Sequence, residues 1–384
     1  MTPPNGSSGY TALLRAPASA VMTVDKYASY PAGADTTVGA VIKYVSKSDA
    51  ENEILCAQLA SDFGLNAPVV QTTPDNIAAL FNSPMKNAKP SFNPQPFQML
   101  AMNLIRGTNL FELCEDGKIL NFSQSVWNRL FFEFGRTAMF DLFIGNFDRF
   151  IRFERNSDGT YEIRKANANL GNVMLEWTPE RGQNVSTTHM IDSTSAAQEP
   201  KLKIEEEAVI FGMVDFFDDE TTTSSSAAAA ATDLSTTTFT SPPSSPKRKK
   251  NDPIAPALHQ FFVETMTEFK RGSPELAKFI LDSVTESLCN SLEGFLNLNR
   301  NDPRIVQLVE HLLNGEDALK KGLAQGFTRL ADPDFHSCDS LRNFGKQTTE
   351  LDRLLSLNIK WLQSQRRVKA RPGQFHELMH GCFL

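Results

Sequence analysis

Five short polar motifs within residues 41–193 carry side chains suited to phosphoryl transfer. In chain order they are VIK (41–43), ENE (51–53), NFDR (146–149), GNVM (171–174) and MIDS (190–193). Transfer of a phosphoryl group needs a cation on the phosphates, carboxylate and amide oxygens around a divalent metal ion, and a carboxylate beside the attacking hydroxyl. Because the motifs supply each of these groups, the sequence predicts a phosphotransferase.

Lys43 is the candidate cation. It follows two apolar residues inside a predicted strand, from which its ammonium could reach the α and β phosphates of a nucleotide. The plain alternative is a solvated lysine, since most strand lysines extend into water. Glu53, near the start of the helix predicted next, could pair with Lys43 and hold it extended. Glu51 competes with Glu53 for this role, and either could be an ordinary exposed carboxylate on the helix face.

Asp148 is the candidate catalytic base. It follows an apolar helical run and is expected in a loop, where its carboxylate could accept a hydroxyl proton. Residues 153–164 alternate around a Ser-Asp-Gly turn, a pattern typical of a β-hairpin. Since a hairpin returns the chain to its starting point, Asn172 should lie close to Asp148, and the two side chains could face one Mg2+. Asp192, after a short apolar step, is the predicted second metal ligand.

The base and phosphates of a nucleotide have less distinctive candidate contacts. The run FQMLAMNLI (97–105) predicts an edge strand whose backbone at Met102, Asn103 and Leu104 could meet an adenine, and an ordinary core strand is the alternative. The candidate phosphate-binding turn at 16–20 has no glycine. Ser19 or bare backbone amides would therefore have to contact the phosphates.

The elements that must position these residues change in character along the chain. Residues 1–10 read as a loose polar tail, and residues 11–105 contain short alternating apolar runs around one helical segment at 48–65. Beyond residue 121 the apolar residues recur mainly at helical spacing, in runs at 122–138, 256–269, 273–292, 302–313 and 349–365. The sequence thus predicts an α+β fold, with a small antiparallel-sheet lobe at 11–105 and a larger, mainly helical lobe at 106–384.

Residues 221–250 interrupt the helical lobe with Ser, Thr, Ala and Pro repeats. Such a composition buries too little apolar surface to offset chain entropy, so we expect a disordered insertion. Its basic end, KRKK (247–250), could be a nuclear-localisation or regulatory patch, and the plainer interpretation is the solubilising end of a loop.

Composition limits the classes of function. The chain has 384 residues, 41% of them hydrophobic, and a formal net charge of −7, which argues against a nucleic-acid-binding surface over the whole protein. Five scattered cysteines with no CxxC spacing fit a reducing compartment. Since no signal-peptide pattern and no membrane-spanning run is evident, we expect a cytoplasmic protein without membrane partners, with association with the cytoskeleton left open.

The five motifs, in this order, resemble those of the atypical protein kinases typified by actin-fragmin kinase. They are more distantly similar to those of phosphatidylinositol 3/4-kinases and HipA-like kinases, which share an Asp-Arg loop, a later Asn and an aspartate. The resemblance extends over about residues 10–215. It implies a bilobal protein-kinase-like fold that uses ATP with Mg2+, or with Mn2+ in its place.

The resemblance also implies a role for each motif residue. Asp148 would be the catalytic base, Lys43 the phosphate contact, Glu53 the partner of Lys43, and Asn172 and Asp192 the metal ligands. The implied acceptor is a protein hydroxyl, with a threonine of actin, held in a complex of the actin-fragmin type, as the best single expectation.

The chain also departs from the pattern of kinases. It has no GxGxxG loop before Lys43, Asp192 is followed by Ser-Thr instead of Phe-Gly, and no kelch repeats are visible. We therefore interpret the chain as a catalytic portion or a short relative of this family.

Three rival functions fit parts of the sequence. A phosphoinositide-type lipid kinase would be expected to carry a basic segment after Asp192, whereas residues 193–220 are net acidic. A catalytically dead, kinase-shaped scaffold would be expected to lack at least one of the motif residues, and none is lost. The motif HELMH, with His376, Glu377 and His380, matches a zinc-protease helix, but the residues after it supply no third ligand, and a terminal packing helix is the alternative.

Overall fold

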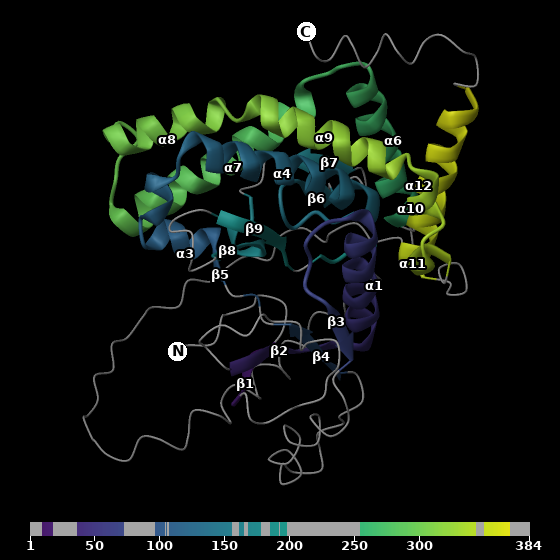
Figure 1. Ribbon diagram of the computed structural model, residues 1–384. Helices are drawn as coiled ribbons and strands as arrows, with labels where there is room; N and C mark the ends of the chain where they lie inside the picture. The colour runs from purple at the N-terminus through teal and green to yellow at the C-terminus, as the bar shows by residue number, and fades with distance from the viewer. Residues whose placement is uncertain are drawn as a thin grey trace, which may run out of the picture. The chain divides into compact units, whose positions relative to one another are not determined.

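The computed structural model describes residues 10–17, 37–72, 97–103, 105, 107–155, 161–164, 168–177, 185–191, 193–197, 254–342 and 349–368. All of them belong to one compact unit, formed by Met1–Glu199 and Ile254–Leu384. The unit mixes helix and sheet, is mostly helical, and its sheets are small and antiparallel (Figure 1). The predicted α+β class is confirmed at this level. The lobe boundaries stay a prediction, and the insertion at 221–250 lies outside the described residues.

The first sheet has four antiparallel strands in the order β1-β2-β4-β3. Their bounds are β1 (Tyr10–Pro17), β2 (Thr37–Ser46), β3 (Val70–Thr72) and β4 (Phe97–Asn103). The prediction of an edge strand at 97–105 is wrong, because β3 pairs with β4 from Val70, opposite Met102, to Thr72, opposite Leu100. Lys43 lies in the central strand β2, between β1 and β4, where it is opposite Leu100.

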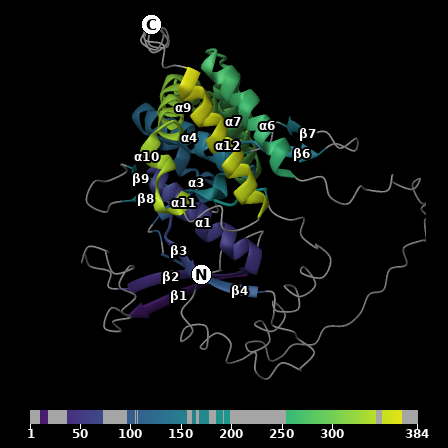
Figure 2. The same cartoon turned by 90° about the vertical axis from the view of Figure 1, so that its right-hand side faces the viewer.

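Helix α1 (Lys47–Phe63) is buried on two faces. Ala50, Ile54 and Ala57 recur at helical spacing and pack with Val70 and Leu100 of the sheet. A second face, with Cys56, Leu59, Ala60 and Phe63, belongs to the large core formed with the helices. Figure 2 shows α1 between the four-stranded sheet and the helices. The helix that carries Glu53 is therefore fixed from both sides.

The large core surrounds α4 (Gln124–Ile144), which is buried almost continuously over its C-terminal half. The other described helices of four or more residues are α3 (Leu110–Glu115), α6 (Ile254–Lys270), α7 (Glu275–Leu296), α8 (Pro303–Leu313), α9 (Glu316–Leu330), α10 (Pro333–His336), α11 (Asp339–Arg342) and α12 (Glu350–Val368), with one short 3-10 turn at Lys118–Asn121. Helix α4 ends at Gly145, whose φ of 72° is a left-handed conformation that glycine adopts without strain. This cap turns the chain into the loop that carries Asp148.

Two smaller sheets are formed mainly by the strands that follow that loop. The hairpin predicted at 153–164 is present as β6 (Arg152–Arg155) and β7 (Tyr161–Arg164), with Phe153 opposite Ile163. The 3-10 turn η3 (Leu170–Asn172) leads into a sheet of order β5-β8-β9, with β5 (Gly107–Asn109), β8 (Val173–Trp177) and β9 (Val185–Met190). The hairpin is thus a detour between the loop at Asp148 and the turn at Asn172.

The most extensive helix pairing in the described part of the chain, α4 on α9, depends on glycines. A Cβ added to Gly322 would stand 2.0 Å from the carbonyl oxygen of Phe132, and one added to Gly135 would stand 2.3 Å from that of Leu319. Because these contacts are with backbone atoms, only displacement of a helix could relieve them. The glycines therefore set how closely α9 approaches the helix that leads into the loop at Asp148.

We expect Gly322→Ala to lower the free energy of unfolding by about 1–3 kcal/mol, the usual cost of overpacking. Gly294→Ala is the matched control, because the added methyl meets no atom within 4 Å at this exposed helical position. The control substitution should raise the free energy of unfolding by up to about 1 kcal/mol, since alanine favours the helix over glycine. Urea unfolding of both variants checks the prediction. Equal stability of the two variants would contradict close packing at Gly322.

None of the helices in the described ranges combines the length and the apolar composition needed to cross a membrane.

Candidate active site

Lys43 and Glu53 form a buried ion pair. The distance from Lys43 Nζ to Glu53 Oε2 is 3.0 Å, and the two side chains are 5% and 3% exposed. Glu51, the competing candidate, is exposed. Two buried charges are tolerated only when they compensate each other, so the pair holds the Lys43 ammonium of β2 against Glu53 of α1.

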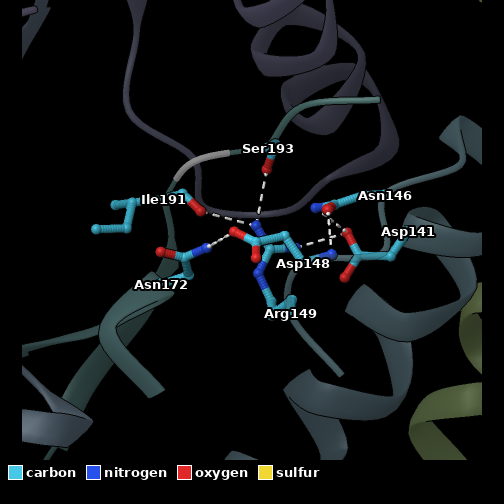
Figure 3. Close-up of polar contacts among 7 residues, drawn as sticks. All are labelled: Asp141, Asn146, Asp148, Arg149, Asn172, Ile191 and Ser193. Atoms are coloured by element: carbon cyan, nitrogen blue, oxygen red, sulfur yellow. Dashed lines mark hydrogen bonds and ion pairs between the residues drawn. The ribbon is translucent and has the colours of Figure 1, made fainter. Parts of the chain in front are cut away.

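Asp148 and Asn172 lie together, as their order around the hairpin predicts. Asn172 Nδ2 donates to Asp148 Oδ2 at 3.2 Å (Figure 3). Asn169 Nδ2 donates to the same oxygen at 3.3 Å. Asp148 is exposed, whereas Asn172 is only 6% exposed. The side-chain amides of Asn169 and Asn172 thus orient the Asp148 carboxylate, and the exposed side of this carboxylate is open to an incoming molecule.

The loop conformation at Asp148 is set by Asn146. The backbone N–H of Asp148 donates to Asn146 Oδ1 at 3.1 Å, which is a local turn stabilised by an asparagine side chain. Asn146 in turn donates through Nδ2 to Asp141 Oδ1 at 3.1 Å, and through its backbone N–H to the Asp141 carbonyl at 2.8 Å. The last turn of α4 therefore holds the loop that presents Asp148.

Arg149 is the buried centre of this site. Its side chain is fully buried and donates from Nη1 to Asp141 Oδ1 at 2.6 Å. Its Nη2 donates to the Ile191 carbonyl at 2.8 Å and to Ser193 Oγ at 3.0 Å (Figure 3). One guanidinium group thus joins helix α4 to both residues that flank position 192.

Asn52 joins α1 to the same segment. Its Nδ2 donates to the Ser195 carbonyl at 3.1 Å, and its Oδ1 accepts from the Ser195 backbone N–H at 3.1 Å. Asn52 is 6% exposed and is adjacent to Glu53. The two reciprocal bonds therefore join α1, whose Glu53 pairs with Lys43, to the 193–197 segment.

The remaining predicted site residues have different outcomes. Asn103 lies in β4, where its backbone N–H donates to the Val69 carbonyl at 3.4 Å and its Oδ1 accepts from the Val69 N–H at 2.6 Å. Met102 lies in the same strand, paired on both sides. Much of the backbone expected to meet adenine is therefore already paired within the sheet, and adenine contact there stays a prediction. Ser19, Leu104, Asp192 and the HELMH motif (376–380) lie outside the described residues.

Sequence reasoning missed Asn52, Asp141 and Asn169 as parts of this site. Asp141 carried a signal, since it is a single carboxylate within the apolar run TAMFDLFIG and is followed by an arginine eight residues later. A buried carboxylate needs a cationic partner, which points to Arg149. Asn52 and Asn169 gave no comparable signal, because their partners lie on distant segments.

Asp141 is expected to make the stability of the protein pH-dependent. Burial raises the pKa of its carboxyl from 3.8 to about 6 and outweighs the opposing effect of Arg149. Asp141 Oδ2 and Arg149 Nε also have no hydrogen-bond partner among the described residues, which adds to the cost of burying the ionised pair. A pKa above the unfolded value means that the folded state binds this proton more tightly.

The contribution of Asp141 to stability is therefore complete below about pH 4 and is lost as the pH rises through about 6. Comparison of the parent protein with the Asp141→Asn variant isolates this contribution of the Asp141 carboxyl group to stability. We expect the free energy of unfolding of the parent, relative to the variant, to fall between pH 4 and pH 7 by on the order of 3 kcal/mol. Urea unfolding at several pH values measures this difference, and a constant difference would disprove the shift.

The residues present fit a magnesium ion in part. Asn172 uses its amide nitrogen on Asp148, which leaves its Oδ1 directed away from that carboxylate (Figure 3). Amide and carboxylate oxygens are the protein ligands that Mg2+ takes beside substrate phosphates and water. In the described ranges no three His, Cys, Asp or Glu side chains gather as a metal cluster, but a nucleotide-dependent Mg2+ site needs only one or two carboxylates.

No protein-family model matches this chain, and comparison with curated proteins finds no significant match.

Proposed function

We propose that this protein is an ATP-dependent protein kinase of the atypical, bilobal type, which transfers the γ-phosphoryl group to a serine or threonine hydroxyl. The observation that carries the proposal is the 3.2 Å contact between Asp148 and Asn172, two polar residues brought together by the hairpin between them. The buried Lys43–Glu53 pair supports it independently.

Each group has a role in the proposed reaction. The exposed carboxylate of Asp148 accepts the proton of the attacking hydroxyl, while the amide donors of Asn169 and Asn172 keep it oriented. Lys43, held by Glu53, contacts the α and β phosphates of ATP. Arg149 and Asn52 position the 191–195 segment relative to both. In-line transfer requires this kind of fixed relative placement more than covalent chemistry from the protein.

Mg2+, or Mn2+, would neutralise the negative charge that develops on the transferred phosphoryl group. Asn172 and Asp192 are the side chains that would hold it. The acceptor is proposed to be a protein, with actin as the first candidate, because of the resemblance to actin-fragmin kinase.

Incubation with γ-labelled ATP tests the proposal. The panel contains actin, actin with fragmin, a generic phosphoacceptor protein and phosphoinositide vesicles, each with Mg2+, with Mn2+ and with a chelator. Metal-dependent label on serine or threonine of a protein supports the proposal. Label on lipid alone would replace it with a phosphoinositide kinase, and label on no acceptor with retained ATP binding would indicate a non-catalytic scaffold.

A further inference from the structure

A second candidate site lies at the C-terminal end of α1, formed by residues from five helices. It is a cavity of about 710 Å3, within the range of about 300–1,000 Å3 usual for small-molecule sites. Its apolar wall includes Phe63 of α1, Phe327 of α9 and Leu362 of α12. Neither Asp148 nor Asn172 lines it, so it is separate from the candidate active site.

The polar wall of the cavity is cationic. Arg136, Lys270 and Arg329 line it, and Asp332 is the one carboxylate among its described lining residues. Asp332 is already paired with Arg329, Oδ2 to Nη1, at 2.6 Å, and Arg136 Nη1 is paired with Glu133 Oε2 at 3.1 Å. Lys270 therefore supplies the net positive charge, and one cation in a partly apolar hollow is suited to a molecule with an anionic head and an apolar body.

The two arginines are held in place by the end of α1. Arg136 Nη2 donates to the Gly64 carbonyl at 2.7 Å, and Arg329 Nη2 donates to the Asp62 carbonyl at 2.7 Å. Carbonyls at the end of a helix lack intrahelical donors, so both guanidinium groups satisfy a backbone requirement. They are therefore fixed before any ligand arrives, which lowers the entropy lost on binding.

Lys270 has the most capacity left for an anion. Its Nζ donates to Gln365 Oε1 at 2.7 Å and lies 6.0 Å from the centre of the Trp361 ring, and none of the carboxylates in the described ranges lies within ion-pair distance. An ammonium group has three donors, so two stay available. Burial also lowers the pKa of this amino group, an effect that a bound anion would offset.

We propose that this cavity binds an amphipathic anion, a molecule with one carboxylate or similar head group on an aliphatic or aromatic body. The head group contacts Lys270, and the body lies against Phe63, Phe327 and Leu362. This site does not depend on the proposed kinase activity.

Calorimetric titration with sodium dodecanoate, kept below its micelle concentration, tests the proposal. We expect one molecule to bind per chain and to raise the midpoint of thermal unfolding, since it binds the folded state. Lys270→Gln should weaken binding on the order of tenfold, the value of one charge-assisted hydrogen bond. Lys278→Gln, at an exposed position on α7, is the matched control and should bind like the parent.

Two further measurements make the outcome decisive. Thr328→Trp fills the cavity from an exposed position on α9 without a change of charge, and it should abolish binding. Dodecyltrimethylammonium, which has the same chain with a cationic head, should not bind. Absence of dodecanoate binding to the parent, equal affinity in Lys270→Gln, or equal binding of the cationic analogue would each overturn the proposal. None of these results bears on ATP transfer.

Discussion

Asp148→Asn is expected to reduce the rate of phosphoryl transfer by about 10²–10⁴-fold while ATP affinity stays close to that of the parent. The loss follows from removal of the base that accepts the hydroxyl proton. Nucleotide affinity should persist, because the proposed phosphate contact Lys43 and its partner Glu53 are on other segments. The variant should also fold, since asparagine has the same shape, and its side-chain oxygen can still accept from Asn172.

The matched control is Asp339→Asn, a carboxylate that is 93% exposed on the short helix α11. It removes the same charge at a place remote in sequence from every motif, so phosphorylation should be unaffected. Initial rates with labelled ATP and fluorescent nucleotide titrations measure the two effects separately. An Asp148→Asn variant that retains the parental rate would remove Asp148 from the mechanism.

Helices and strands could be predicted from the sequence where the apolar residues recur at one regular spacing. The apolar run at 37–45 became β2, and the helical spacing at 48–65 became α1, whose apolar residues are buried on two faces. The hairpin at 153–164 followed from its turn residues. From this hairpin came the proximity of Asp148 and Asn172, and the pairing of Lys43 with Glu53 was also among the features of the site that the sequence could predict.

Helix α9 and the pairing of β3 with β4 could not be predicted in this way. Gly322 and Gly326 weaken the helical pattern of α9, and they are present because α4 approaches too closely for a side chain. Strand β3 has only three residues, too few for a visible alternation, yet it covers β4 and removes the predicted edge. In α9 and in β3, contacts with a distant segment determine the structure more than the helix or strand preference of the local sequence does.

The side-chain hydrogen bonds that join the segments of the site also could not be predicted from the sequence. Asn52 and Ser195 are 143 residues apart, and Arg149 reaches Ser193 from 44 residues away. Asparagine and serine fit many local environments, so their types alone do not indicate a distant partner. Only the fold shows that α1, the loop at Asp148 and the 191–195 segment are joined by side-chain hydrogen bonds.

The Lys43–Glu53 pair is expected to contribute to both stability and catalysis, and a double-mutant cycle separates the two. Lys43→Met leaves the Glu53 carboxylate buried without the ammonium, and Glu53→Leu leaves Lys43 without the carboxylate. Each single variant should lose about 3–5 kcal/mol of unfolding free energy, the usual cost of breaking a buried ion pair. The double variant, with apolar side chains of similar size, should recover most of this loss.

Phosphorylation should not recover with stability. A nucleotide-binding lysine is needed for its charge at the phosphates, and neither of the two apolar side chains in the double variant supplies that charge. Urea unfolding and initial rates of the parent, both single variants and the double variant complete the cycle. If the double variant regained activity together with stability, the pair would be a packing element of α1 and β2 only. A stable but inactive double variant would instead show that an apolar pair holds α1 and β2 together equally well. The two buried charges, and the free energy that their burial costs, would then be needed for phosphoryl transfer and not for stability.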